Sequence, residues 1–211
     1  MSLYKDYIRK YLGWRNWAVL YYNSIFENLF VFFYIGISTE NYSNNFILNI
    51  LLFLIFSLFS STYGYLINDM ADRDLDKKHG KQNTFSEDSN LRSWSVVFIT
   101  LILSVFFAIP FLQYNLFIIL WGTWLFLATF YSLKPIRFKE WGKAGLIIVV
   151  IAQRVLPVLI AFSAFDFKVL PDLIFITLYL FFRGITSDMN HQIQDYAVSY
   201  THLTLPTNRE V

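Results

Sequence analysis

Apolar residues of this chain gather in six long runs that short polar segments separate. A membrane-spanning helix needs about 20 apolar residues, because the hydrocarbon core of a bilayer is about 30 Å thick. Each run meets this requirement and is predicted to be a transmembrane helix. The predicted fold class is therefore all-α, a polytopic transmembrane helical bundle. The runs cover approximately residues 17–37, 46–67, 94–112, 116–133, 146–165 and 170–186.

The composition supports a membrane protein. The chain has 211 residues, of which 56% are hydrophobic, 20% are aromatic and 15% are charged, whereas about 25% of residues are charged in an average soluble protein. So few polar side chains cannot cover a water-facing surface, and we expect the remaining surface to contact lipid. The composition excludes a disordered chain, and the absence of cysteine excludes a disulfide scaffold. A net charge of +2 gives no reason to expect a nucleic-acid partner.

The distribution of Lys and Arg predicts the orientation of the spans. The N-terminal segment and the second and fourth connections carry four, five and four of these residues, whereas the other three connections together carry only Lys168. Cytoplasmic loops of membrane proteins are enriched in Lys and Arg. We therefore predict a multi-pass protein of the inner (cytoplasmic) cell membrane. Its N-terminus and its Asp-rich loops are predicted to be cytoplasmic.

Three carboxylates follow the second apolar run, at Asp69, Asp72 and Asp76. At 100° per residue they fall within about 60° of one helix face. Carboxylates this close repel one another unless a cation neutralises them, and Mg²⁺ is often shared between carboxylates and a substrate phosphate. We predict that all three are catalytic residues and metal ligands. The alternative is a solvated acidic loop whose charges pair with neighbouring Arg and Lys side chains.

A second acidic group ends the sixth run, at Asp188 and Asp195 with His191 between them. The two aspartates are seven residues apart and therefore lie within about 20° of each other on a helix. An even number of spans separates them from the first group, so both groups emerge on the same side of the membrane. Asp188 and Asp195 are predicted to be further metal ligands. His191 is either a donor to a substrate phosphate or a structural imidazole.

A basic segment follows the fourth run and contains Tyr131, Lys134, Arg137 and Lys139. A diphosphate that lies between two metal-binding groups needs further positive charge when it departs. We predict that Lys139 is catalytic and that Tyr131, Lys134 and Arg137 bind the substrate. The alternative is that these charges only set the orientation of the spans.

Polar residues also occur within the spans, at Asn23 and Glu27 in the first run and at Arg154 in the fifth. They are costly in lipid and should face the interior of the bundle. Asn23 and Glu27 share a helix face and are predicted to contact an acceptor substrate. Alternatively, Glu27 forms a structural ion pair with Arg154. The aromatic side chains of the spans suit a pocket for an isoprenoid chain and a carbocation, although helix packing also favours them.

The sequence resembles the UbiA-type membrane prenyltransferase superfamily at Asn68, Asp69, Asp72 and Asp76, which match its first signature, Asn-Asp-x-x-Asp-x-x-x-Asp. The resemblance implies a lipid-open helical bundle that binds an isoprenyl diphosphate with Mg²⁺. It implies that the prenyl group passes, through an allylic carbocation, to a lipophilic, often aromatic, acceptor. It also assigns Asn68 to substrate binding and the aspartates to the metal.

The resemblance extends over about residues 10–196. Residues 131–142 are similar to the basic connection of the family, and residues 188–195 to the approach to its second Asp signature. For the diphosphate, the resemblance implies metal ligands at Asp69, Asp72, Asp76, Asp188 and Asp195.

Two departures from the family pattern predict a truncated enzyme. Ser199 stands where the second signature has its last aspartate, and six spans are present of about nine. We assign residues 1–196 to an incomplete prenyltransferase domain. Residues 197–211 are similar to translated sequencing-adapter sequence and are predicted to be an artefactual tail. We expect the native gene to continue with three more spans.

Three other functions are compatible with part of the pattern. An ion-binding membrane transporter would use the charges within the spans. A CDP-alcohol phosphotransferase is also Asp-rich, but its two Asp groups lie closer together in sequence than Asp76 and Asp188 do. The third alternative is an inactive fragment of the prenyltransferase.

Overall fold

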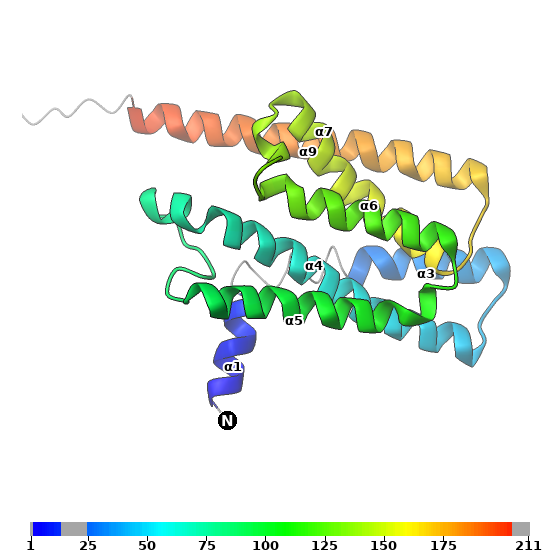
Figure 1. Ribbon diagram of the computed structural model, residues 1–211. Coiled ribbons are helices and arrows are strands. Elements are labelled where there is room, and N and C mark those ends of the chain that lie inside the picture. Colours follow the sequence, from blue (N-terminus) through cyan, green and yellow to red (C-terminus); the bar gives the residue numbers. More distant parts are fainter. Residues whose placement is uncertain (1, 14–24, 204–211) are drawn as a thin grey trace, which may run out of the picture.

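The computed structural model describes residues 2–13 and 25–203, with side chains for residues 5–13 and 25–190, as a helical bundle (Figure 1). Every element in these ranges is helical, which confirms the predicted all-α fold. The elements are α1 (Ser2–Ile8), η1 (Arg9–Gly13), α3 (Glu27–Thr39), α4 (Asn44–Lys78), α5 (Asn90–Ala108), η3 (Ile109–Phe111), α6 (Asn115–Ser132), η4 (Phe138–Glu140), α7 (Lys143–Val150), η5 (Ile151–Val155), α8 (Leu156–Ala164) and α9 (Leu170–Leu203).

Five helical segments are long and apolar enough to cross a membrane, which confirms the second to sixth predicted spans. The first predicted span begins among residues 14–24, which lie outside the described residues. Its described part belongs to α3, which has 13 residues. The five segments are Asn44–Lys78, Asn90–Phe111, Asn115–Ser132, Lys143–Ala164 and Leu170–Asn190.

Helix α4 is the centre of the bundle. It packs along its length against the antiparallel α5 and also contacts α6, while α8 packs on α6 and α3, and α9 packs on α7 (Figure 1). Aromatic rings fill the core. The ring centroid of Phe53 lies 5.1 Å from that of Phe56 and 5.2 Å from that of Phe32. Edge-to-face contacts of this kind add to the stabilisation from burial.

Helix α4 is long enough to carry its polar C-terminal end past the apolar run. It begins after Ser43, whose hydroxyl accepts a hydrogen bond from the amide of Phe46, and ends before Gly80, which has a φ of +63°. Lys77 and Lys78 in its last turn favour the negative end of the helix dipole. The predicted acidic residues therefore lie on one continuous helix with the second span.

Three of the helices present their C-terminal ends at the same end of the bundle (Figure 1). These helices are α4, α6 and α9, which carry the first acidic group, lead into the basic segment and carry the second acidic group. The even number of spans between the two acidic groups accounts for this arrangement.

The N-terminal segment docks on the loop between α4 and α5. Lys10 and the hydroxyl of Tyr11 both donate hydrogen bonds to the carboxylate of Asp88, at 2.8 and 3.0 Å. Burial, and then the hydrogen bond to Asp88, raise the pKa of Tyr11 to about 12. Tyr11 therefore stays protonated and remains a donor at neutral pH.

Candidate functional site

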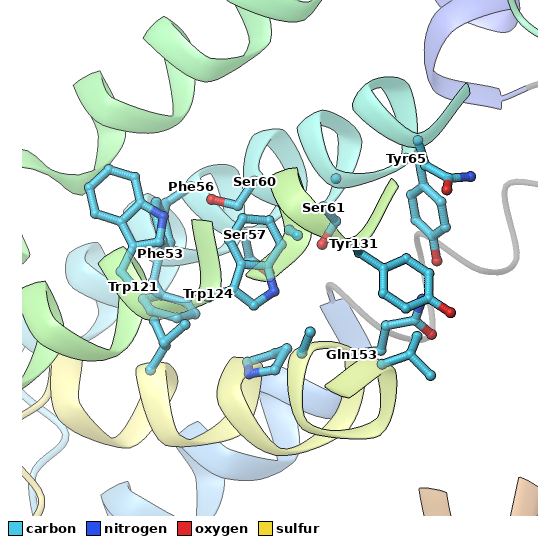
Figure 2. A pocket seen from close by; sticks show the side chains of 17 residues that line it. Phe53, Phe56, Ser57, Ser60, Ser61, Tyr65, Trp121, Trp124, Tyr131 and Gln153 are labelled. Atoms are coloured by element: carbon cyan, nitrogen blue, oxygen red, sulfur yellow. The ribbon is translucent and has the colours of Figure 1, made fainter. Parts of the chain in front are cut away.

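A cavity of about 230 Å³ lies between α4, α6 and the α7–η5–α8 segment (Figure 2). Its wall on α4 repeats every three or four residues, as one face of a helix does. This wall is rich in small residues, whereas the α6 wall carries large aromatic rings. The lining residues are Phe53, Phe56, Ser57, Ser60, Ser61, Gly64, Tyr65, Asn68, Trp121, Trp124, Ala128, Tyr131, Val149, Ala152, Gln153, Pro157 and Ile160.

The two ends of the cavity differ in chemistry. Phe53, Phe56 and Trp121 gather at one end, and Tyr65 and Tyr131 at the other, together with Gln153 (Figure 2). We call the second end the polar mouth. A lining that is apolar in its depth and polar at its mouth suits an amphiphilic ligand whose polar group stays at the mouth.

The polar mouth continues into the predicted acidic group. Asn68 lines the cavity and accepts a hydrogen bond from the hydroxyl of Ser132, and Asp72 follows one turn later on α4. The Asp72 carboxylate forms ion pairs with Arg137, at 3.2 Å, and with Lys139. All three of these side chains are largely buried. The Asp72 carboxylate thus meets, beside the cavity, two cations that lie more than 60 residues further along the sequence.

Arg73, the neighbouring basic residue on α4, contacts groups other than the Asp72 carboxylate. Arg73 lies 3.8 Å from the carboxylate of Asp74 and donates a hydrogen bond to the side chain of Asn90 at 2.5 Å. This arrangement differs from the alternative in which local basic residues neutralise the whole acidic stripe.

The other two carboxylates of the stripe contact the loop that follows α4. Asp69 is 0% exposed, and its carboxyl group accepts hydrogen bonds from the hydroxyl of Thr84 at 2.5 Å and from the amide of Thr84 at 3.3 Å. The side-chain amide of Asn83 donates at 2.8 Å both to the backbone carbonyl of Asp69 and to the carboxylate of Asp76. Asp69 and Asp76 therefore hold this loop against α4.

Replacing Thr84 with Val is expected to destabilise the fold by about 1–3 kcal/mol, because a buried carboxyl group loses a hydrogen-bond donor. The midpoint of thermal unfolding in detergent should fall. Thr123→Val is the matched control, because Thr123 is exposed on α6 and its hydroxyl donates a hydrogen bond within its own helix, to the carbonyl of Ile119. Equal midpoints for the two variants would contradict a structural role for the Asp69–Thr84 contact.

The basic segment is held in an unusual backbone conformation. Arg137 has a φ of +50° and a ψ of +62°, and it directly precedes the short helix η4. Left-handed conformations of this kind cost a non-glycine residue about 1–3 kcal/mol and persist only where surrounding contacts enforce them. One such contact comes from α7, where an added Cβ on Gly145 would lie 2.5 Å from the carbonyl oxygen of Phe138. The absence of a side chain at Gly145 therefore lets α7 approach the backbone beside Lys139.

The change Gly145→Ala is expected to destabilise the protein by about 1–3 kcal/mol, because backbone atoms cannot yield as a flexible side chain can. It should also displace Lys139 from Asp72. Gly122→Ala is the control, since no described atom lies within 4 Å of a Cβ at that position. The midpoint of thermal unfolding should be lower for Gly145→Ala than for Gly122→Ala, and equal midpoints would contradict the close approach.

The second acidic group reaches the same mouth through Asp188. This half-buried residue on α9 interacts electrostatically with Tyr131, as Asp72 also does. Both carboxylates therefore act electrostatically on one tyrosine that lines the cavity. Lys134 is exposed. Asn23 lies outside the described residues, as do the side chains of His191 and Asp195.

The sequence matches the UbiA prenyltransferase family over residues 29–201. The chain belongs to the UbiA prenyltransferase family. This assignment confirms the resemblance found in the Asp-rich motif and identifies a multi-pass membrane protein of a prenyltransferase family. No match was found among curated proteins or among solved structures.

The polar residues within the spans of this UbiA-family protein form contacts between helices. Glu27 lies 3.9 Å from Arg154, as one sequence alternative proposed, and 3.8 Å from Arg183 on α9. The next residue, Asn28, is buried and donates a hydrogen bond to the hydroxyl of Ser57 at 2.9 Å. These contacts join α3 to three other parts of the bundle.

Sequence reasoning missed the cavity wall on α4. Its signal was the recurrence of small residues at helical spacing, Ser57, Ser60, Ser61 and Gly64, directly before Asn68. Among the side chains that the structure describes, no three His, Asp or Glu groups lie close enough together to hold a metal ion.

Proposed function

We propose that this UbiA-family protein is a Mg²⁺-dependent prenyltransferase. It would transfer a prenyl group from an isoprenyl diphosphate to a lipophilic, often aromatic, acceptor. The observation that carries the proposal is the cluster of Asp72, Arg137 and Lys139 at the polar mouth of an aromatic cavity. The cluster supplies charges for a diphosphate, and the cavity supplies an apolar space for the chain attached to it.

Arg137 and Lys139 are the proposed diphosphate donors. A guanidinium group offers planar, paired N–H donors that match phosphate oxygens, and an ammonium group offers a compact charge. Both cations are paired with Asp72 and therefore lie together beside the polar mouth, which supports a shared role in binding a diphosphate. The left-handed backbone of Arg137 is consistent with a residue that is positioned for binding.

The donor chemistry at the mouth fits Mg²⁺, since carboxylate oxygens are the ligands that this ion prefers. We propose Asp72, Asp76, Asp188 and Asp195 as its ligands. We leave Asp69 out of this set, because its carboxyl group is fully buried and engaged by Thr84, whereas Asp76, which accepts a hydrogen bond from Asn83, is only half-buried. When bound, the metal would supply positive charge to the diphosphate.

In the proposed reaction, the bond between the first carbon of the prenyl group and the diphosphate oxygen breaks, and the electron pair stays on that oxygen. Hydrogen bonds from Arg137 and Lys139 would stabilise this developing charge. The ring of Tyr131 lines the polar mouth, where the allylic cation would form, and ring faces attract cations. A carbon of the acceptor ring then attacks the cation, and its proton passes to the released diphosphate.

We further propose that the mouth faces the cytoplasm. The basic segments flank it, and cytoplasmic loops are enriched in Lys and Arg. The charged diphosphate could then enter from water while the prenyl chain enters from the bilayer, which is the other proposed partner.

Binding of radiolabelled geranyl diphosphate to the chain in nanodiscs tests the proposal. We expect binding with Mg²⁺, loss of binding after chelation with EDTA, and competition by inorganic diphosphate but not by geraniol. Binding that is indifferent to Mg²⁺ and to inorganic diphosphate would overturn the proposal. A panel of phenolic acceptors, added with the bound donor, would then identify the acceptor by the appearance of a prenylated product.

A further inference from the structure

Trp124 stands between the two ends of the cavity (Figure 2). On α6 it comes one turn after Trp121, which lies at the aromatic end, and two turns before Tyr131, which lies at the polar mouth. Its indole ring packs against the α4 wall at Gly64, where an added Cβ would lie 3.4 and 3.5 Å from two ring atoms. The indole therefore lies in contact distance of the α4 wall at this level, and a side chain larger than a methyl group at Gly64 would press against it.

This contact lies between the mouth and the aromatic end. Gly64 precedes Asp72 by eight residues, which is about 12 Å along a helix. A prenyl chain whose diphosphate lies beside Asp72 therefore reaches Trp124 beyond its first isoprene units.

The α4 wall offers an apolar surface even though it contains serines. The hydroxyl of Ser57 accepts a hydrogen bond from Asn28, and the hydroxyl of Ser60 is bonded to that of Ser104 at 2.5 Å. Because these contacts engage their hydroxyl groups, Ser57 and Ser60 act on this wall as small residues that make room. The opposite wall carries the indole ring of Trp124, so the width at this level depends on Trp124.

The cavity is also small. Its volume of about 230 Å³ lies below the range of about 300–1,000 Å³ that is usual for pockets holding drug-sized ligands. A narrow cavity of this volume suits a short isoprenoid better than a long one.

We propose that Trp124, packed on Gly64, determines the length of the prenyl donor and restricts it to geranyl diphosphate or shorter. This inference rests on the proposed function, because it takes the cavity to hold the prenyl chain. Removing the indole would widen the cavity between its two ends. Adding a large side chain at Gly64 would narrow it.

The test compares the Mg²⁺-dependent Kd values of dimethylallyl, geranyl, farnesyl and geranylgeranyl diphosphate for the chain in nanodiscs. In Trp124→Ala the affinity for farnesyl relative to geranyl diphosphate should rise by about tenfold or more, since each methylene in an apolar pocket discriminates by about that factor. Trp124→Phe should give a smaller change in the same direction. Gly64→Leu should shift the preference toward dimethylallyl diphosphate.

Trp94→Ala is the control, because Trp94 packs against the core on α5 and is not part of the cavity wall. Its length preference should equal that of the unaltered chain. An unchanged preference in both Trp124 variants, with geranyl diphosphate still bound, would overturn this inference and leave the proposed function standing. Absence of Mg²⁺-dependent binding of every donor by the unaltered chain would instead overturn the proposed function.

Discussion

Replacing Asp72 with Asn is expected to lower prenyl transfer by about 10²–10³-fold, the usual effect of removing one preorganised electrostatic contact from an active site. The amide cannot neutralise Arg137 and Lys139 as the carboxylate does, and it is a poor ligand for Mg²⁺. The measurement is the release of diphosphate from geranyl diphosphate in the presence of Mg²⁺ and phenolic acceptors. Mg²⁺-dependent binding of the donor should weaken in parallel.

Asp74→Asn provides a matched control. It makes the same change two residues away on α4, where the side chain is 92% exposed, and we expect turnover within about twofold of the unaltered chain, as for most exposed substitutions. Membrane insertion and thermal unfolding should be similar for both variants. If Asp72→Asn retained full activity, Asp72 would have no place in the metal and diphosphate site.

Replacing both Arg137 and Lys139 with Gln in one variant is expected to abolish measurable turnover. In each single variant, turnover should fall by about 10²–10³-fold, because the substitution removes a charged donor to the departing diphosphate. The losses should not simply add, since the two cations share Asp72 as partner. Arg137→Lys should retain more activity than Arg137→Gln but less than the unaltered chain, because an ammonium group lacks the paired donors of a guanidinium group.

Lys143→Gln is the control for this pair. Lys143 is exposed at the start of α7 and lies close in sequence to the basic segment, so it contributes to the local positive charge without a place at the mouth. Its turnover should match that of the unaltered chain. Equal losses from Lys143→Gln and Lys139→Gln would mean that only the overall positive charge matters, which would contradict the specific geometry proposed here.

The sequence alone determined the class of the protein and much of its topology. Runs of about 20 apolar residues predict spans wherever they occur, because lipid requires every backbone polar group to be bonded within the helix. The helical spacing of Asp69, Asp72 and Asp76 predicted that the second helix continues past residue 67. Helix α4 does continue to Lys78 and contains all three residues. The Asp-rich motif sufficed for the family, because a motif of fixed spacing needs no tertiary contact to be recognised.

The tertiary structure decided how those residues are used. Helical spacing put the three carboxylates on one face. In the structure, however, the carboxyl group of Asp69 bonds to Thr84 and that of Asp76 bonds to Asn83. The carboxylate of Asp72 instead forms ion pairs with Arg137 and Lys139. Spacing could not distinguish the three carboxylates, because the partners come from loops whose positions depend on the packing of α4, α6 and α7. The cavity likewise exists only between helices, and contacts between distant segments are not recorded in the periodicity of any one of them.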